Sequence, residues 1–188
     1  MSILEYAASI LSIVLGLGVA QLLGGVAWVI RHPSGGIWVW LLGGWCLTLL
    51  LVIIGWWWGI WLLFQNLEAL SFWSFLPAFG VSTLLFVSSR LLVPDMATLD
   101  HGVRSHFPEV TRPFFLCIAG VFMLGLVAVP IQGGATEYLL SIEGILTIVL
   151  GSTALTAAFV RKPTYHAFIL AFWTLAYLAQ QALQPDLG

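Results

Sequence analysis

Residues 4–30 form one long apolar stretch, and this stretch most limits what the chain can fold into. It has one charged residue, Glu5, near its start and one glutamine, Gln21, near its middle. As a helix it is roughly 40 Å long, which is enough to cross a bilayer with some tilt. Charged residues make up only 7% of the whole chain, whereas soluble domains carry about 25%. The sequence therefore predicts an integral membrane protein, because so apolar a chain cannot cover a water-soluble globule with polar surface.

Six apolar segments follow one another along the chain, and turn signals separate them. Proline, glycine and polar residues mark the connections, as in the HPSGG stretch at 32–36. We expect the six segments to cross the membrane as a compact all-α bundle that forms one domain over residues 1–188. The expected spans are 4–30, 37–64, 72–93, 113–131, 142–160 and 164–184.

The longest hydrophilic stretch, 94–113, lies between the third and fourth expected spans. Its apolar residues recur at steps of three and four positions, which is one face of a helix. Asp95 can cap the start of such a helix, and Asp100 and Arg104 are spaced as an i,i+4 pair on its polar side. The sequence predicts a short amphipathic helix on the cytoplasmic surface, with the apolar face Met96, Leu99, Val103 and Phe107.

The basic residues predict the orientation of the chain. All of them fall where the first, third and fifth spans end, and the positive-inside rule makes that side cytoplasmic. Both termini are then expected outside, in the inner (plasma) membrane of a bacterial cell. The net charge of −2 is too small to indicate a nucleic-acid partner. The basic residues are Arg31, Arg90, Arg104, Arg112, Arg161 and Lys162.

Small residues recur every fourth position along 4–30, and this spacing lets a second helix approach closely. A further small or polar set, formed by Gly18, Gln21 and Gly25, falls on another face, so we expect this helix to be central and packed on two sides. Such surfaces favour a homo-oligomer or a subunit of a membrane complex. The ladder is Ala8, Ser12, Gly16, Ala20 and Gly24, and a second close-packing pair is Gly55 and Gly59.

Two short stretches carry a resemblance. The sequences SIVLGLGVAQLLGG at 12–25 and VRSHFPEVTRPFF at 103–115 resemble a loose group of small bacterial membrane proteins that have several spans and no assigned function. The resemblance implies a bacterial inner-membrane source. It implies no activity and no site residues.

Ionisable groups at membrane depth are costly and are therefore candidates for function. Glu5, Glu68 and Glu143 lie near the outer ends of the first, second and fifth spans. If these ends converge, the three carboxylates form a mouth that attracts cations. The alternative is that each carboxylate sits among lipid headgroups, and Glu143 also suits the first turn of a helix.

A polar track follows one face of the first span, from Glu5 through Ser9 and Ser12. Gln21 continues the polar character near mid-membrane, where an amide needs a partner. The track favours a transport route beside this helix. The alternative for Gln21 is a structural hydrogen bond to a neighbouring helix.

Three function classes follow from these features. The favoured one is a small channel or transporter for an ion or small solute, and the second is a non-catalytic subunit of a larger membrane complex. The third is an enzyme, whose best version is a metal site at His101 and His106. Five positions separate these histidines, so they do not share one helix face as an i,i+4 metal pair does. The sequence therefore predicts no metal, no cofactor and no catalytic residue.

Overall fold

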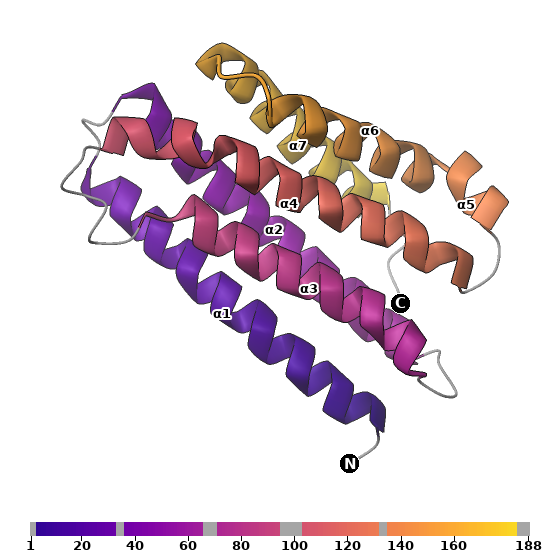
Figure 1. Ribbon diagram of the computed structural model, residues 1–188. Helices are drawn as coiled ribbons and strands as arrows, with labels where there is room; N and C mark the ends of the chain where they lie inside the picture. The colour runs from indigo at the N-terminus through magenta and orange to yellow at the C-terminus, as the bar shows by residue number, and fades with distance from the viewer. Residues whose placement is uncertain (1–2, 33–35, 66–70, 95–102, 132–134, 184–188) are drawn as a thin grey trace.

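A computed structural model describes residues 3–32, 36–65, 71–94, 103–131 and 135–183. Within these ranges all regular structure is helical, which confirms the all-α class (Figure 1). Successive helices run in opposite directions along the bundle, except for the short α5. The helices are α1 (Ile3–Arg31), α2 (Ile37–Gln65), α3 (Phe72–Leu92), α4 (Val103–Ile131), α5 (Ala135–Leu140), α6 (Ile142–Ala157) and α7 (Pro163–Leu183).

Four helices of the described chain are long and apolar enough to cross a membrane, and they indicate a membrane-embedded protein. A short apolar helix, α6, and a helix with a polar start, α7, complete the bundle. α6 has 16 residues, and α7 opens with the polar run Thr164, Tyr165 and His166. The six-span count therefore stays a prediction. The four long apolar stretches are Leu4–Arg31, Ile37–Leu62, Phe72–Leu92 and His106–Leu126.

The separate amphipathic helix between the third and fourth spans is not confirmed. Residues 103–113 are instead the first part of the continuous helix α4, and 95–102 lie outside the described residues. Phe107, expected on the membrane-facing side, is fully buried. Its ring lies 5.8 Å from that of Trp38 and 5.7 Å from that of His166. This stretch continues α4 because its apolar side packs into the bundle.

α2 lies in the interior of the bundle, as α4 also does. α2 packs against α1, α3, α4 and α7, whereas α1 lies at one edge and packs against α2 and α3 (Figure 1). The expectation that the first apolar segment is central is therefore wrong, although that segment does pack on two sides. Buried residues explain the position of α2, since Leu42, Trp45, Leu49 and Ile53 are each almost fully covered by neighbouring helices.

The packed face of α1 is the one that carries Gly18 and Gly25. A Cβ atom added at Gly25 would lie 2.7 Å from Cγ2 of Val93 and 2.9 Å from Sγ of Cys46. A Cβ added at Gly24 would meet no atom within 4 Å. Close approach of α1 to α2 and α3 therefore depends on Gly25 and not on its neighbour.

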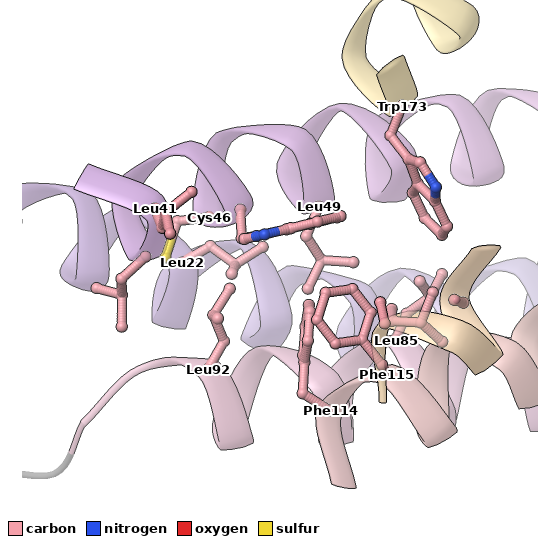
Figure 2. Packing of buried hydrophobic residues seen from close by; sticks show 14 of the residues in the cluster. Leu22, Leu41, Cys46, Leu49, Leu85, Leu92, Phe114, Phe115 and Trp173 are labelled. Carbon is pink, nitrogen blue, oxygen red and sulfur yellow. The ribbon is translucent and has the colours of Figure 1, made fainter. Parts of the chain in front are cut away.

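Large apolar side chains from α1, α2, α3, α4 and α7 fill the core. Figure 2 shows Leu49, Phe114, Phe115 and Trp173 converging there. Trp45, which is 1% exposed, makes edge-to-face contacts with Phe114, Phe115 and Trp173 at ring-centroid distances of 5.9, 4.9 and 5.6 Å. Such edge-to-face geometry is favoured between aromatic rings, so this half of the bundle is tightly packed.

The basic residues of the described chain gather at one end of the bundle, which we call the basic end. The carboxyl ends of α1, α3 and α6 and the amino ends of α4 and α7 meet there (Figure 1). Arg112 lies over the ring of Phe159 at 5.3 Å, which joins the start of α4 to the residues after α6. The basic residues there are Arg31, Arg90, Arg112, Arg161 and Lys162, and Arg104 belongs to the first turn of α4.

Candidate functional site: a central cavity

A cavity of about 240 Å³ lies among α2, α3, α4, α6 and α7, with Tyr138 of α5 at its edge. A single water needs about 10–15 Å³ of such space, so the cavity has room for a small organic molecule. On α7 its lining runs from Trp173 to Gln180, and on α2 it begins at Thr48. We call this space the central cavity.

The walls of the central cavity are apolar and aromatic, and neutral polar groups interrupt them. Trp56, Phe122 and Trp173 supply aromatic surface from three helices. None of the described lining residues is charged. The polar members are Thr48, Tyr138, Thr147, Tyr177 and Gln180.

Two threonine hydroxyls in the lining are already engaged in hydrogen bonds. Thr48 Oγ1 lies 2.9 Å from Thr174 Oγ1, which joins α2 to α7. Thr147 Oγ1 donates to the Glu143 carbonyl oxygen at 2.8 Å and lies 3.2 Å from the Tyr138 hydroxyl. These bonds fix the walls because an unpaired polar group in an apolar interior is costly.

Both indole N–H groups of the lining are engaged as well. Trp56 Nε1 donates to Ser82 Oγ at 3.1 Å, and this bond joins α2 to α3. Trp173 Nε1 donates to Thr153 Oγ1 at 2.9 Å, and this bond joins α7 to α6. The two indoles therefore present their ring surfaces to the cavity from fixed positions.

Tyr177 and Gln180 differ from these residues, because neither side chain hydrogen-bonds to another residue that the structure describes. Both belong to α7, and Trp173, Tyr177 and Gln180 are spaced i, i+4 and i+7, which is one face of a helix. The cavity therefore has one wall where hydrogen-bonding groups are available to a bound molecule.

The cavity narrows toward the basic end. There Trp45, Leu49 and Phe114 line a separate space of about 10 Å³, which adjoins the wider cavity and shares wall residues such as Thr48 with it. We call this narrow space the floor of the central cavity, because it is too small to hold a solute.

Aromatic rings continue from this floor to the basic end. The ring of Phe115 stacks on that of His166 at 5.4 Å, and Trp38 lies 6.3 Å from the same imidazole. His166 is fully buried, and its Nε2 lies 2.7 Å from the Val160 carbonyl oxygen. We call Trp38, Trp45, Phe107, Phe114, Phe115 and His166 the aromatic plug, because they close this end.

The other end of the cavity reaches the bundle end opposite the basic residues. Gln180 lies in the last turns of α7, and Tyr138 lies in α5, which Figure 1 shows at that end. The central cavity therefore lies toward the end opposite the basic residues, and the aromatic plug lies between it and the basic end.

The sequence-predicted polar track lies away from the central cavity, and its last member, Ser12, faces α2. Glu5 and Ser9 are exposed, and the Ser9 hydroxyl donates to the Glu5 carbonyl oxygen at 2.8 Å. Ser12 Oγ accepts from Trp57 Nε1 at 3.0 Å. Ser12 also borders a second space of about 200 Å³ between α1 and α2, which has an almost wholly apolar lining. A route past these residues stays a prediction.

Gln21 lies between α1 and α3, where its Oε1 accepts from Arg90 Nη1 at 3.1 Å. This geometry is what the structural alternative for Gln21 expects, since the bond links two helices. Gln21 does not line the central cavity.

The described residues do not bring the expected carboxylates Glu5, Glu68 and Glu143 together. Glu143 is exposed in the first turn of α6, and α3 and α4 lie between α1 and α6 (Figure 1). Glu5, at the start of α1, is therefore on the far side of two helices from Glu143. Glu68 lies outside the described residues.

The small residues expected to pack helices divide into two groups. Ala8 is half-buried against a small cluster that includes Leu11, and Gly55 lines the central cavity. The remaining members are exposed, and added Cβ atoms at the glycines among them would meet nothing within 4 Å. The exposed members are Gly16, Ala20, Gly24 and Gly59.

The candidate metal pair also has no described site. His101 lies outside the described residues, and Nε2 of His106 lies 3.2 Å from the Leu92 carbonyl oxygen. Among the described residues, no three His, Cys, Asp or Glu side chains lie close enough together to hold a metal ion.

Sequence reasoning overlooked Tyr177 and Gln180 because it gave weight to charged residues. One sequence pattern could have identified them. Trp173, Tyr177 and Gln180 are spaced to lie on one helix face, and each carries a polar group in an otherwise apolar segment. Thr48 and Thr147 are isolated hydroxyls in apolar helices, and only the packing of five helices brings them together.

No protein-family model, no curated protein and no solved structure matches this chain. The central cavity and its side chains are therefore the features from which a function can be inferred.

Proposed function

We propose that the protein is a small channel or transporter whose solute passes through the central cavity. The observation that carries this proposal is the position of the central cavity, which lies toward one end of an apolar bundle, with the aromatic plug between it and the other end. Transporters that work by alternating access hold their substrate in such a cavity and open the closed side by moving helices. The plug is then the part that must rearrange for passage.

The solute is small and uncharged. None of the described lining residues is charged, and an ion in this surrounding would lose its hydration without gaining a counter-charge. Neutral hydroxyl and amide groups such as Tyr177 and Gln180 instead suit a solute that forms hydrogen bonds. This narrows the expected substrate from an ion or small solute to a neutral solute.

The proposed topology has six spans with both termini outside a bacterial inner membrane. α6 alone is roughly 24 Å long, which is short of the 30 Å hydrocarbon core. α5 precedes it directly through the N-cap Ser141, whose hydroxyl accepts from the Gly144 N–H at 3.1 Å, and lengthens this crossing. The gathering of Arg and Lys at the basic end supports a cytoplasmic location for that end.

The second candidate is a non-catalytic subunit of a larger membrane protein complex, whereas the channel or transporter itself is expected to be a homo-oligomer. The observation that favours the subunit role is the exposed row of Gly16, Ala20 and Gly24 on α1. In lipid, close helix association depends on such small residues. Gentle extraction followed by mass analysis of the intact particle distinguishes the cases: other polypeptides in fixed ratio support a complex, and only this chain supports a self-contained transporter.

Cavity filling tests the transport proposal. Gly125 borders the cavity, and a Cβ there meets nothing within 4 Å, so Gly125→Leu adds bulk without a backbone clash. Gly59→Leu is the matched control, because Gly59 also has open space but is exposed on the outside of α2. We expect the wild type and Gly59→Leu to carry glycerol or urea into proteoliposomes, and Gly125→Leu to lose most of this flux. Equal flux in the two variants contradicts a route through the cavity.

A further inference from the structure

The aromatic side chains of the central cavity surround it from several helices. Trp56 comes from α2, Phe122 from α4, and Trp173 and Tyr177 from α7. Phe122 and Trp173 meet edge to face, with ring centroids 5.3 Å apart and an interplanar angle of 89°. A flat ring placed among these side chains finds both ring faces and ring edges, which are the two surfaces that aromatic groups prefer to contact.

The hydrogen-bonding capacity of the cavity is concentrated at one place. The N–H groups of Trp56 and Trp173 are already engaged. Tyr177 and Gln180 supply the uncommitted groups, a hydroxyl and an amide, without a described partner. A bound molecule with a matching donor or acceptor can hydrogen-bond to these two groups. A molecule without such a group leaves them unpaired, so it is expected to bind much more weakly.

The order of these residues along α7 sets an orientation. Trp173 lies nearest the floor, Tyr177 follows one turn later, and Gln180 lies nearest the opposite end of the bundle. At 1.5 Å per residue, Trp173 and Gln180 are roughly 10 Å apart along the helix. A single or fused ring with one polar substituent covers the distance between Trp173 and Gln180. Its ring then lies toward the floor of the cavity, and its polar group lies toward Gln180.

We infer that the central cavity binds an uncharged molecule made of one flat ring system and one hydrogen-bonding group, as in phenol or indole. This inference rests on the proposed function, because it names the class of neutral molecule that the same cavity binds most tightly. Charged rings are rejected because none of the described lining residues can neutralise them. Saturated rings are expected to enter the cavity but to bind more weakly, because they cannot stack against Trp173 or Phe122 as a flat ring does.

Equilibrium binding to the purified full chain in lipid nanodiscs tests this inference, with empty nanodiscs as the background. The probes are indole and phenol, compared with benzoate as a charged ring and cyclohexanol as a saturated ring. We expect saturable binding of indole and phenol at about one molecule per chain, and at least tenfold weaker binding of benzoate and cyclohexanol. Equal binding of phenol and cyclohexanol, or no saturable binding of either aromatic probe, overturns the inference.

Variants place the binding in the cavity. Gly125→Leu is expected to abolish saturable binding, and Tyr177→Phe and Gln180→Leu are each expected to weaken it about tenfold. Tyr6→Phe is the control for Tyr177→Phe, because Tyr6 is exposed on α1 and lies away from the cavity. Wild-type affinity in Gly125→Leu, with its thermal unfolding unchanged, overturns the inference.

The inference and the proposed function fail in different ways. If Gly125→Leu loses glycerol or urea flux and no aromatic probe binds saturably, the aromatic ligand class is rejected and the transport route through the cavity is supported. If Gly125→Leu abolishes saturable indole binding but leaves flux unchanged, the ligand class is supported and transport through the cavity is rejected.

Discussion

Two adjacent glycines on α1 test which face of this helix packs against the bundle. At Gly25 an added methyl group would lie 2.7 Å from Val93 Cγ2 and 2.9 Å from Cys46 Sγ. At Gly24 the same methyl group meets nothing within 4 Å. Gly25→Ala is therefore expected to separate α1 from α2 and α3, whereas Gly24→Ala leaves the packing unchanged.

The comparison isolates the packing term in the free energy of unfolding. Both substitutions gain the helix propensity of alanine over glycine, about 1 kcal/mol, so this gain cancels between them. Overpacking a well-filled contact costs about 1–3 kcal/mol. The branched Val93 side chain cannot swing aside freely, so we expect Gly25→Ala to be about 1–3 kcal/mol less stable than Gly24→Ala.

Thermal unfolding in nanodiscs measures this difference. A loss of 1 kcal/mol lowers Tm by about 2–4 °C in a chain of this size, so the two variants should differ by about 2–12 °C. Adding Val93→Ala to Gly25→Ala removes the nearer contact and should recover part of the loss. A Tm for Gly25→Ala equal to or above that of Gly24→Ala refutes the packing of α1 through its Gly25 face.

Three further variants test separate parts of the account. Gly144→Ala should lower Tm by several degrees, because its methyl group would overlap the Tyr138 carbonyl oxygen where α5 turns into α6; an unchanged Tm contradicts this tight turn. Thr48→Val should cost about 1 kcal/mol in thermal unfolding by removing the bond to Thr174, and no loss would mean that the bond contributes nothing. Gln21→Leu should leave glycerol flux intact, since Gln21 links α1 to α3 outside the cavity; abolished flux would favour the route beside α1.

Much of the helix pattern could be predicted from the sequence. A chain in lipid must satisfy its backbone hydrogen bonds within each segment, so long apolar runs bounded by polar turns mark helices directly. α2 begins at Ile37, where the expected span begins, and α3 begins at Phe72 in the same way. The start of α4 could not be predicted in this way, because a helix can continue through polar residues when Phe107 on its inner side is buried by other helices.

The packing face of α1 could not be predicted from that segment alone. The regular ladder through Gly16 and Gly24 is a better match to the small-residue pattern than Gly18 and Gly25 are. The choice between faces depends on Val93 and on other side chains elsewhere in the chain. A pattern within one helix therefore gives the candidate faces, and the partner helices select among them.

The central cavity could not be predicted from the sequence for a related reason. Thr48, Tyr138, Thr147 and Tyr177 are unremarkable neutral residues in their own segments. They become a site only because several helices leave a gap between them. Charged residues such as Glu5 drew attention in the sequence, yet in the structure Glu5 is exposed at the start of an edge helix.

Reversible blocking of the cavity tests most directly the claim that the solute route lies there. Gly125→Cys places a thiol at the cavity wall, and methyl methanethiosulfonate, a small neutral reagent, converts it to a methyl disulfide. Gly59→Cys and the wild type, which retains Cys46 and Cys117, are the controls. The account predicts that modification stops glycerol flux only in Gly125→Cys and that dithiothreitol restores it. Unchanged flux in fully modified Gly125→Cys would contradict a route through the central cavity.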